Sequence, residues 1–339
     1  MPAMTDPGGL IHAFVLDGQG GGEPLDWDGI ERWQPAHGVL WVNLDYQGQD
    51  SQAWLGMRSG VDPVIRDALL DRDPRPRALA VGDSLLLILR GINLNQGAEP
   101  EDMVSVRCWI EPGRIITMRH RPVRVLKTIA ADLQRGAGPR TPGQFVREVA
   151  ERALEPVVTV VDGIDDAVAR AEDDALADAP PTKLRAQLAD LRRRAIALRR
   201  FVAPQREAFN RLGATTLPWL GEEERARLRE AEGRLTRTVE ELDAARDRAS
   251  VTHEEMASRI GEITNQRLYV LSILSAIFLP LGFLADVLGV SVGGVPGKET
   301  SWAFWAMCAA FALGGWVQLW LFRRYKWIGD NRPDRQKPD

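Results

Sequence analysis

Four small or acidic residues lie on one side of an otherwise apolar segment between Leu268 and Leu288. Asp286 is the only charged residue of this segment, and at about 100° per residue in a helix it shares a stripe with Ser272, Ser275 and Gly282. Hydroxyl, carboxylate and backbone oxygens are ligands of hard divalent cations, and a carboxylate in an apolar segment usually faces a wet interior. The pattern predicts a stripe that contacts a hydrated cation, although small residues also mark close helix packing in lipid.

Leucines on the same side predict hydrophobic constrictions. Leu268, Leu271 and Leu279 fall within about 60° of Asp286 on a helix, and such rings can close a water-filled path by dewetting. The opposite side carries only apolar residues: Ile273, Ile277, Pro280 and Leu284. One stripe cannot enclose a path, so transport requires an oligomer. Repeated copies of Asp286 would form a ring that attracts cations and, through its crowded carboxyl groups, responds to protons.

Two apolar segments are long enough to cross a bilayer. Residues 268–288 read LYVLSILSAIFLPLGFLADVL, and residues 302–322 read WAFWAMCAAFALGGWVQLWLF with no charge. As helices they would each span about 32 Å, against a hydrocarbon core of about 30 Å. We predict a first and a second transmembrane helix over these ranges, the alternative being two helices buried in a soluble core.

Flanking charges predict the orientation of these helices. Arg267 precedes the first segment, and the tail 323–339 begins with Arg323 and Arg324. The loop 289–301 carries only Lys298 and Glu299, whose charges nearly cancel. Basic residues favour the cytoplasmic side, so both termini should be cytoplasmic and residues 289–301 should form an outer loop.

Residues 1–140 have the pattern of an α/β cytoplasmic domain. Strands are expected at 11–16, 38–46, 83–92, 103–110 and 114–120, and helices at 63–71 and 122–135. The tripeptide Glu111-Pro112-Gly113 predicts a hairpin between the last two strands. Neither GxGxxG nor GxxxxGK[ST] occurs, so no nucleotide-binding loop is predicted.

Residues 141–267 are predicted to be helical, with helices at about 144–177, up to about 212, and from Gly221 onward. In the third helix, apolar or small residues recur every seven positions: Leu228, Leu235, Leu242, Ala249, Met256, Ile263 and Val270. This heptad seam favours coiled-coil-like packing and continues into the first apolar segment. It predicts one stalk helix of about 68 residues, near 100 Å long. Packing against another subunit and packing within its own subunit remain open.

Composition excludes several classes of protein. The chain has 339 residues, 45% hydrophobic and 27% charged, with a net charge of −4 and two cysteines. It is too apolar for a disordered chain, too poor in cysteine for a disulfide scaffold, and too acidic for a nucleic-acid binder. The first residues lack the basic and apolar regions of a signal peptide, so none is expected. No nucleophile–base pair or metal-ligand cluster is apparent, which argues against an enzyme.

The segment IFLPLGFLADVLGVSVGGVPG (277–297), followed by a second span and a basic tail, resembles the end of the CorA divalent-cation transporters. Its GGVPG extension is most similar to the zinc-transporting ZntB branch. The resemblance implies a homopentameric pore in the bacterial inner membrane with an α+β cytoplasmic funnel domain. A long stalk helix would continue as the pore-lining first helix of a two-helix transmembrane hairpin. The family pore would be lined by Asn265, Leu268, Leu271, Leu279, Gly282 and Asp286.

The family signature, Gly-x-Asn, corresponds here to Gly289, Val290 and Ser291. In the family, the asparagine ring binds the hydrated cation at the outer mouth. Serine offers a hydroxyl acceptor but is shorter, so this ring would be wider and its affinity or selectivity altered. Ser291 and Asp286 are therefore the residues expected to contact the transported metal ion.

The resemblance predicts transport of Zn²⁺ with no cofactor beyond the transported ion. Transport of Mg²⁺ or Co²⁺ by the same fold is the first alternative, because oxygen ligands suit hydrated Mg²⁺ and no Cys/His cage is visible. A second alternative is a membrane-anchored metal sensor or scaffold that does not conduct, which Ser291 in place of asparagine would explain. The expected partners are the lipid bilayer, divalent metal ions and further copies of the chain.

Overall fold

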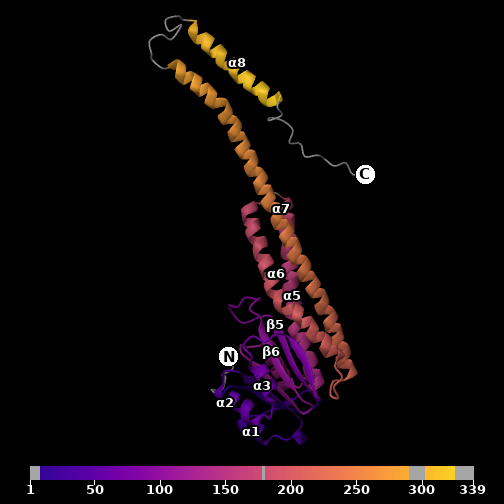
Figure 1. The fold of residues 1–339 in the computed structure, drawn as a ribbon. Coiled ribbons are helices and arrows are strands. Elements are labelled where there is room, and N and C mark those ends of the chain that lie inside the picture. The colour runs from indigo at the N-terminus through magenta and orange to yellow at the C-terminus, as the bar shows by residue number, and fades with distance from the viewer. Residues whose placement is uncertain (1–7, 178–179, 290–301, 325–339) are drawn as a thin grey trace, which may run out of the picture. The chain divides into compact units, whose positions relative to one another are not determined.

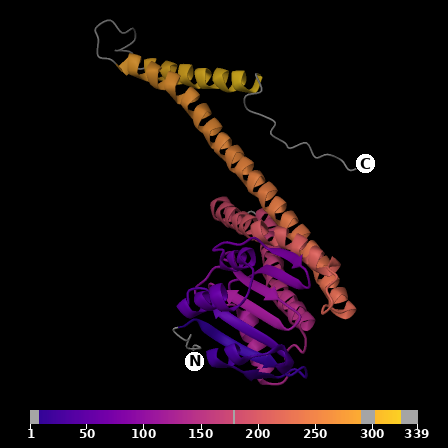
Figure 2. The ribbon, with the colours of Figure 1, turned by 60° about the horizontal axis from the view of Figure 1, so that its bottom comes forward.

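The computed structural model describes residues 8–177, 180–289 and 302–324 (Figures 1 and 2). It contains two compact units, Met1–Met256 and Ala257–Asp339. The division falls inside helix α7 (Glu222–Gly289), which matches the predicted helix of about 68 residues. It lies eleven residues before the boundary at 267 that the sequence suggests. Each unit is described separately below.

A seven-stranded sheet forms the centre of the first unit, with the order β2-β1-β3-β7-β6-β5-β4. The strands are β1 (Leu10–Leu16), β2 (Gly22–Pro24), β3 (Val39–Asp45), β4 (Arg77–Val81), β5 (Ser84–Gly91), β6 (Val104–Ile110) and β7 (Arg114–Arg119). Strands β3 and β7 are parallel, and the other neighbouring strands are antiparallel. This mixed sheet confirms the α+β class and the five predicted strands.

The predicted hairpin between β6 and β7 is confirmed. Glu111 and Arg114 exchange backbone hydrogen bonds across the turn, with N···O distances of 2.7 and 3.3 Å. The Arg114 guanidinium also pairs with the Glu111 carboxylate at 2.7 Å. The turn therefore fixes the register in which Cys108 lies opposite Thr117.

Helices cover both faces of the sheet, so the central strands β5 and β6 are buried almost throughout. One face packs on residues of α1 (Trp27–Arg32), the turns at Trp54–Arg58 and α3 (Pro63–Leu70). The other face packs on α4 (Arg124–Gln134), α5 (Pro142–Leu176), α6 (Pro181–Ala214) and α7. The remaining short elements are α2 (Gln49–Ala53) and the turn Pro35–His37. Burial on two faces explains the continuous apolar runs of these strands.

The α5 helix begins where the sequence changes character. Thr141 is its N-cap, and the threonine hydroxyl accepts a hydrogen bond from the Gln144 backbone N–H at 3.2 Å. Pro142 follows at the first helical position, where its missing N–H costs nothing. The three predicted helices of residues 141–267 are thus confirmed as α5, α6 and α7.

The heptad seam of α7 is buried only in its first half. Leu228, Leu235, Leu242, Ala249 and Met256 are buried in one cluster with residues of α5 and α6. Ion pairs from α6 and α5, Arg199 with Asp243 and Asp165 with Arg248, flank this contact. In this half the seam packs within its own chain. Of the two alternatives left open by the sequence, packing within the subunit is therefore the one found here. Beyond Met256 the next seam residue, Ile263, is 39% exposed.

In the second unit, the end of α7 and helix α8 (Ala303–Arg324) coincide with the predicted spans 268–288 and 302–322. Among the described residues, none of the helices combines enough length with enough apolar character to cross a membrane.

Candidate functional site

The residues predicted to line a cation path lie on one side of α7 and are exposed in the single chain. We call Asn265, Leu268, Leu271, Ser275, Leu279, Gly282 and Asp286 the α7 stripe. Leu268, Leu271 and Leu279 are 55%, 60% and 74% exposed, and the other members are exposed as well. The helix thus presents leucines, a hydroxyl, a glycine and a carboxylate along one side.

Two residues on the opposite side of α7 are partly covered. Ile273 and Ile277 are half-buried, and they lie about 140° and 180° around the helix from Leu268. On α8, the half-buried residues recur every three or four positions, as expected for one helix face: Cys308, Phe311, Gly314, Gly315 and Gln318. The two glycines on this face allow a close approach of another helix. Most other residues of α7 between Tyr269 and Phe283 are exposed as well, so the stripe is part of a large surface of α7 that its own chain leaves exposed.

A proline in α7 creates a polar position within this unit. Pro280 has no N–H, so the carbonyl of Ala276, four residues earlier, has no donor within the helix. The Gln318 side chain of α8 supplies that donor, with an Nε2···O distance of 3.0 Å. The amide thereby links α8 to α7 at the turn that precedes Pro280. The Oε1 atom of Gln318 is buried and has no partner in the part of the chain that the structure describes.

The two serines of this segment differ in their bonding. The Ser272 hydroxyl donates to the Leu268 carbonyl one turn earlier, at an O···O distance of 2.8 Å. Within the described ranges no such bond engages the exposed Ser275 hydroxyl. Of these two serines, Ser275 is therefore the one whose hydroxyl is free to contact water or a hydrated ion.

The signature tripeptide is only partly located. Gly289 is the last residue of α7, whereas Val290, Ser291, Lys298 and Glu299 lie outside the described residues. Of the two residues predicted to contact the transported ion, Ser291 is therefore not described, and Asp286 is exposed on the last turns of α7. Over the described ranges, no group of three or more His, Cys, Asp or Glu residues is arranged to hold a metal ion.

Gln318 is the functional candidate that the sequence reasoning did not identify. It is the only amide of the segment 302–322, and Pro280 is the only proline of the segment 268–288. A lone amide on one apolar helix and a lone proline on its neighbour are a recognisable signal, because the proline always leaves one carbonyl without a donor. The sequence alone does not show that the two helices meet at this level.

An α+β domain joined to one very long helix defines the class of fold. The solved structure of the full-length CmaX protein has the same fold, with a TM-score of 0.82 and 37% identity over 96% of this chain and 100% of that one. The complete structure of the CorA magnesium transporter from Methanocaldococcus jannaschii matches with a TM-score of 0.74, covering 93% of this chain and 98% of that one. At 16% identity this second likeness shows the fold alone.

The chain matches the family described as CorA-like Mg2+ transporter protein over residues 36–324, and it belongs to that family. It is 38% identical over 326 residues to the divalent cation transporter CmaX of Pseudomonas aeruginosa, which covers 95% of this chain and 98% of that protein. It is 34% identical over 318 residues to the zinc transport protein ZntB of Yersinia enterocolitica, with 94% and 96% covered. The predicted resemblance is confirmed. These relatives are named as transporters, which confirms that the chain is not an enzyme.

Proposed function

We propose that this protein moves divalent cations across a membrane through a pore built from several copies of the chain. The end of α7 and α8 would form a transmembrane hairpin at residues 268–288 and 302–322, with both termini in the cytoplasm. The observation that carries the proposal is the α7 stripe, which is exposed opposite the half-buried Ile273 and Ile277. The one carboxylate of the segment 268–288, Asp286, and the hydroxyl of Ser275 are left without a partner among the described residues, which is the surface that a water-filled path requires.

The exposed apolar residues of the second unit support insertion in a bilayer. Leu274, Phe278, Trp305 and Trp316 are exposed large hydrophobic residues of α7 and α8, in addition to the leucines of the stripe. Soluble monomers do not keep apolar surfaces of this extent in water. Lipid would cover the outer residues, and further copies of α7 would enclose the stripe. A homopentamer, with residues 1–267 as a cytoplasmic funnel and stalk, is the assembly that we propose.

Zn²⁺ is the cation we propose, because several relatives at 33–36% identity are named zinc transport proteins. Transport of Mg²⁺ or Co²⁺ is the alternative, since the family is described by Mg²⁺ and the stripe offers only oxygen ligands. Without a His or Cys cage among the described residues, the ion would pass hydrated rather than tightly coordinated.

The stripe suggests how passage would work. Leu268, Leu271 and Leu279 would narrow the path and exclude water until the helices move apart. A ring of Asp286 carboxylates would raise the local concentration of cations at one end and make flux sensitive to protons. Ser291, outside the described residues, would contact the hydrated ion at the outer mouth.

Flux into liposomes that contain the full-length protein tests this proposal. Zn²⁺ and Mg²⁺ entry is followed with trapped fluorescent indicators, and subunit number is measured by native mass determination. We expect Asp286→Asn to lower flux about tenfold, equivalent to about 1.4 kcal/mol, because the attracting charge is lost. Leu279→Ala should raise resting flux by widening a constriction.

Leu274→Ala is the matched control, because Leu274 is an exposed leucine of α7 that lies off the stripe. Its flux should equal that of the wild type. Equal effects of Leu274→Ala and Leu279→Ala, or normal flux in Asp286→Asn, would contradict the stripe as the path. Binding of Zn²⁺ with no flux of any cation would instead identify a non-conducting sensor, the reading that Ser291 in place of asparagine favours.

A further inference from the structure

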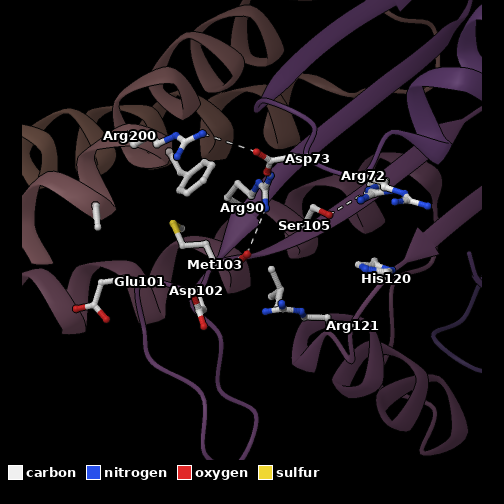
Figure 3. Close-up of a pocket in the computed structure, with 14 residues that line it drawn as sticks. Arg72, Asp73, Arg90, Glu101, Asp102, Met103, Ser105, His120, Arg121 and Arg200 are labelled. Atoms are coloured by element: carbon white, nitrogen blue, oxygen red, sulfur yellow. Dashed lines mark hydrogen bonds and ion pairs between the residues drawn. The ribbon is translucent and has the colours of Figure 1, made fainter.

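A cavity of about 510 Å³ lies in the first unit, at one end of the strands β5 and β6 (Figure 3). Residues of β5, β6 and α6 line it, together with the segments that follow α3 and β7. Its side chains are rich in guanidinium groups: Arg72, Arg90, Arg107, Arg121 and Arg200. None of these residues belongs to the α7 stripe, so the cavity has no role in the proposed cation path.

Arg107 is the unusual member of this group. It lies on β6, is 1% exposed, and donates to the Ser105 hydroxyl at 3.0 Å and to the Leu69 carbonyl at 2.8 Å. Within the described residues no carboxylate forms an ion pair with it. Burial, followed by repulsion from the neighbouring Arg90 charge, lowers the pKa of Arg107 to about 10. A buried charge without a counter-ion is costly, so its retention calls for an explanation.

Arg90, in the same cavity, is an arginine whose charge is balanced by an ion pair. It is also buried, but its guanidinium pairs with Asp73 and donates to the carbonyls of Pro74 and Met103 (Figure 3). Asp73 is shared with Arg200, which approaches to 3.8 Å. Asp73 is therefore already paired with two other arginines, and it reaches Arg107, as Asp71 does, only by attraction at longer range.

The mouth of the cavity adds further positive charge. Arg72 and Arg121 are exposed there, and neither forms an ion pair in the described part of the chain. Figure 3 shows both near His120 at one end of the cavity, whereas Glu101 and Asp102 lie toward the other end. Glu101 is paired with Arg194, so Asp102 is the one lining acid without an ion pair among the described residues.

We propose that this cavity binds a phosphate-bearing anion, with Arg107 at its base and Arg72 and Arg121 at its mouth. Guanidinium groups bind phosphate oxygens through paired, charge-assisted hydrogen bonds, and several can share one doubly charged group. The cavity volume is that of a site for a small metabolite and exceeds the needs of a halide ion. The ligand class is therefore inorganic phosphate or a phosphorylated small molecule.

Binding to the full-length protein in detergent tests this inference. The probes are inorganic phosphate and adenosine triphosphate, added without divalent metal and followed by calorimetric titration and by the thermal unfolding midpoint. Sodium chloride at the same ionic strength is the reference. We expect phosphate, the triphosphate or both to bind and raise the midpoint, whereas chloride does not. Binding of both identifies the phosphate group alone as sufficient, and binding of the triphosphate alone identifies a larger phosphorylated ligand.

Substitutions locate the binding site. Arg72→Gln and Arg121→Gln should each weaken phosphate binding about tenfold, since each removes one charge-assisted contact worth about 1.4 kcal/mol or more. Arg107→Lys keeps the charge but loses the planar fork, so it should weaken phosphate binding. It should also lower the midpoint measured without phosphate, because it disturbs the hydrogen bonds to Ser105 and the Leu69 carbonyl. Arg206→Gln is the matched control: Arg206 is an exposed arginine of α6 that does not line the cavity and has no ion pair among the described residues.

Three results would overturn the inference. The first is equal stabilisation by chloride and phosphate, which indicates ionic strength alone. The second is equal weakening by Arg206→Gln and Arg121→Gln, which indicates a diffuse charge effect. The third is a changed number of subunits in Arg72→Gln or Arg121→Gln while phosphate binding stays unaltered. That result would mean that these arginines pair with acidic groups of a second copy of the chain.

Discussion

The two halves of α7 carry the same heptad pattern but have opposite surroundings. From Leu228 to Met256 the seam is buried against α5 and α6, whereas from Ile263 onward the seam residues are exposed. A seven-residue repeat therefore predicts that one face of the helix is buried, but it does not predict which partner covers that face. In the first half the partner is the same chain, and in the second half we propose that it is lipid and further copies of α7.

The largest expected effect is a difference in the free energy of unfolding between substitutions in the two halves of α7. Leu242→Ala should lower the free energy of unfolding by about 2–5 kcal/mol, because it leaves a cavity in a fully buried cluster. Ile263→Ala should cost less than about 1 kcal/mol, because the side chain is partly exposed. Chemical unfolding of the detergent-solubilised protein measures both. Similar losses at the two positions would show that the halves are equally buried.

A smaller effect is expected at the polar contact of the second half. Gln318→Leu should destabilise the α7–α8 contact by about 1 kcal/mol, since it leaves the Ala276 carbonyl without a donor. Pro280→Ala restores an N–H within the helix, so Gln318→Leu should cost clearly less when combined with it. Unfolding of the four proteins of this double-mutant cycle gives the coupling. Additive effects would mean that Gln318 does not act through the carbonyl that Pro280 leaves free.

The smallest effect concerns the charged border of the buried half. Asp243→Ala removes the ion pair with Arg199, whose side chain is partly exposed. The hydrogen bond to Asp243, followed by the attraction of its negative charge, raises the pKa of Arg199. The loss of stability should be about 0.5 kcal/mol and should shrink at high salt. Thermal unfolding at two salt concentrations provides the check, and a loss independent of salt would point to lost packing instead.

The elements that sequence reasoning identified are those with a strong local pattern. The strands β5 and β6 are continuous apolar runs, and the β6–β7 turn carries its own signal. The edge strand β4 was missed because four of its five residues are exposed and it lacks a buried face. The three-residue strand β2 is too short to show any periodicity.

The same distinction applies to the sites. The α7 stripe is predictable because its members share one helix, and helical periodicity places them without knowledge of the fold. The Gln318 contact joins two helices, and the arginines of the cavity come from β5, β6, α6 and the segments that follow α3 and β7. Such groups meet only after the sheet and its helices have assembled, and no spacing along the chain encodes their proximity.

The parallel pairing of β3 with β7 has a consequence for how the protein is made. Leu40 lies beside Arg114 and Asp45 beside Arg119, so the strand β3 keeps one unpaired edge until the chain has been synthesised past residue 119. Contacts between residues so far apart in sequence form slowly, and an uncovered apolar edge can pair with another nascent chain. During synthesis, the first half of the sheet therefore leaves the ribosome with an edge that is prone to aggregation. This edge is covered only after the second half of the sheet has been synthesised.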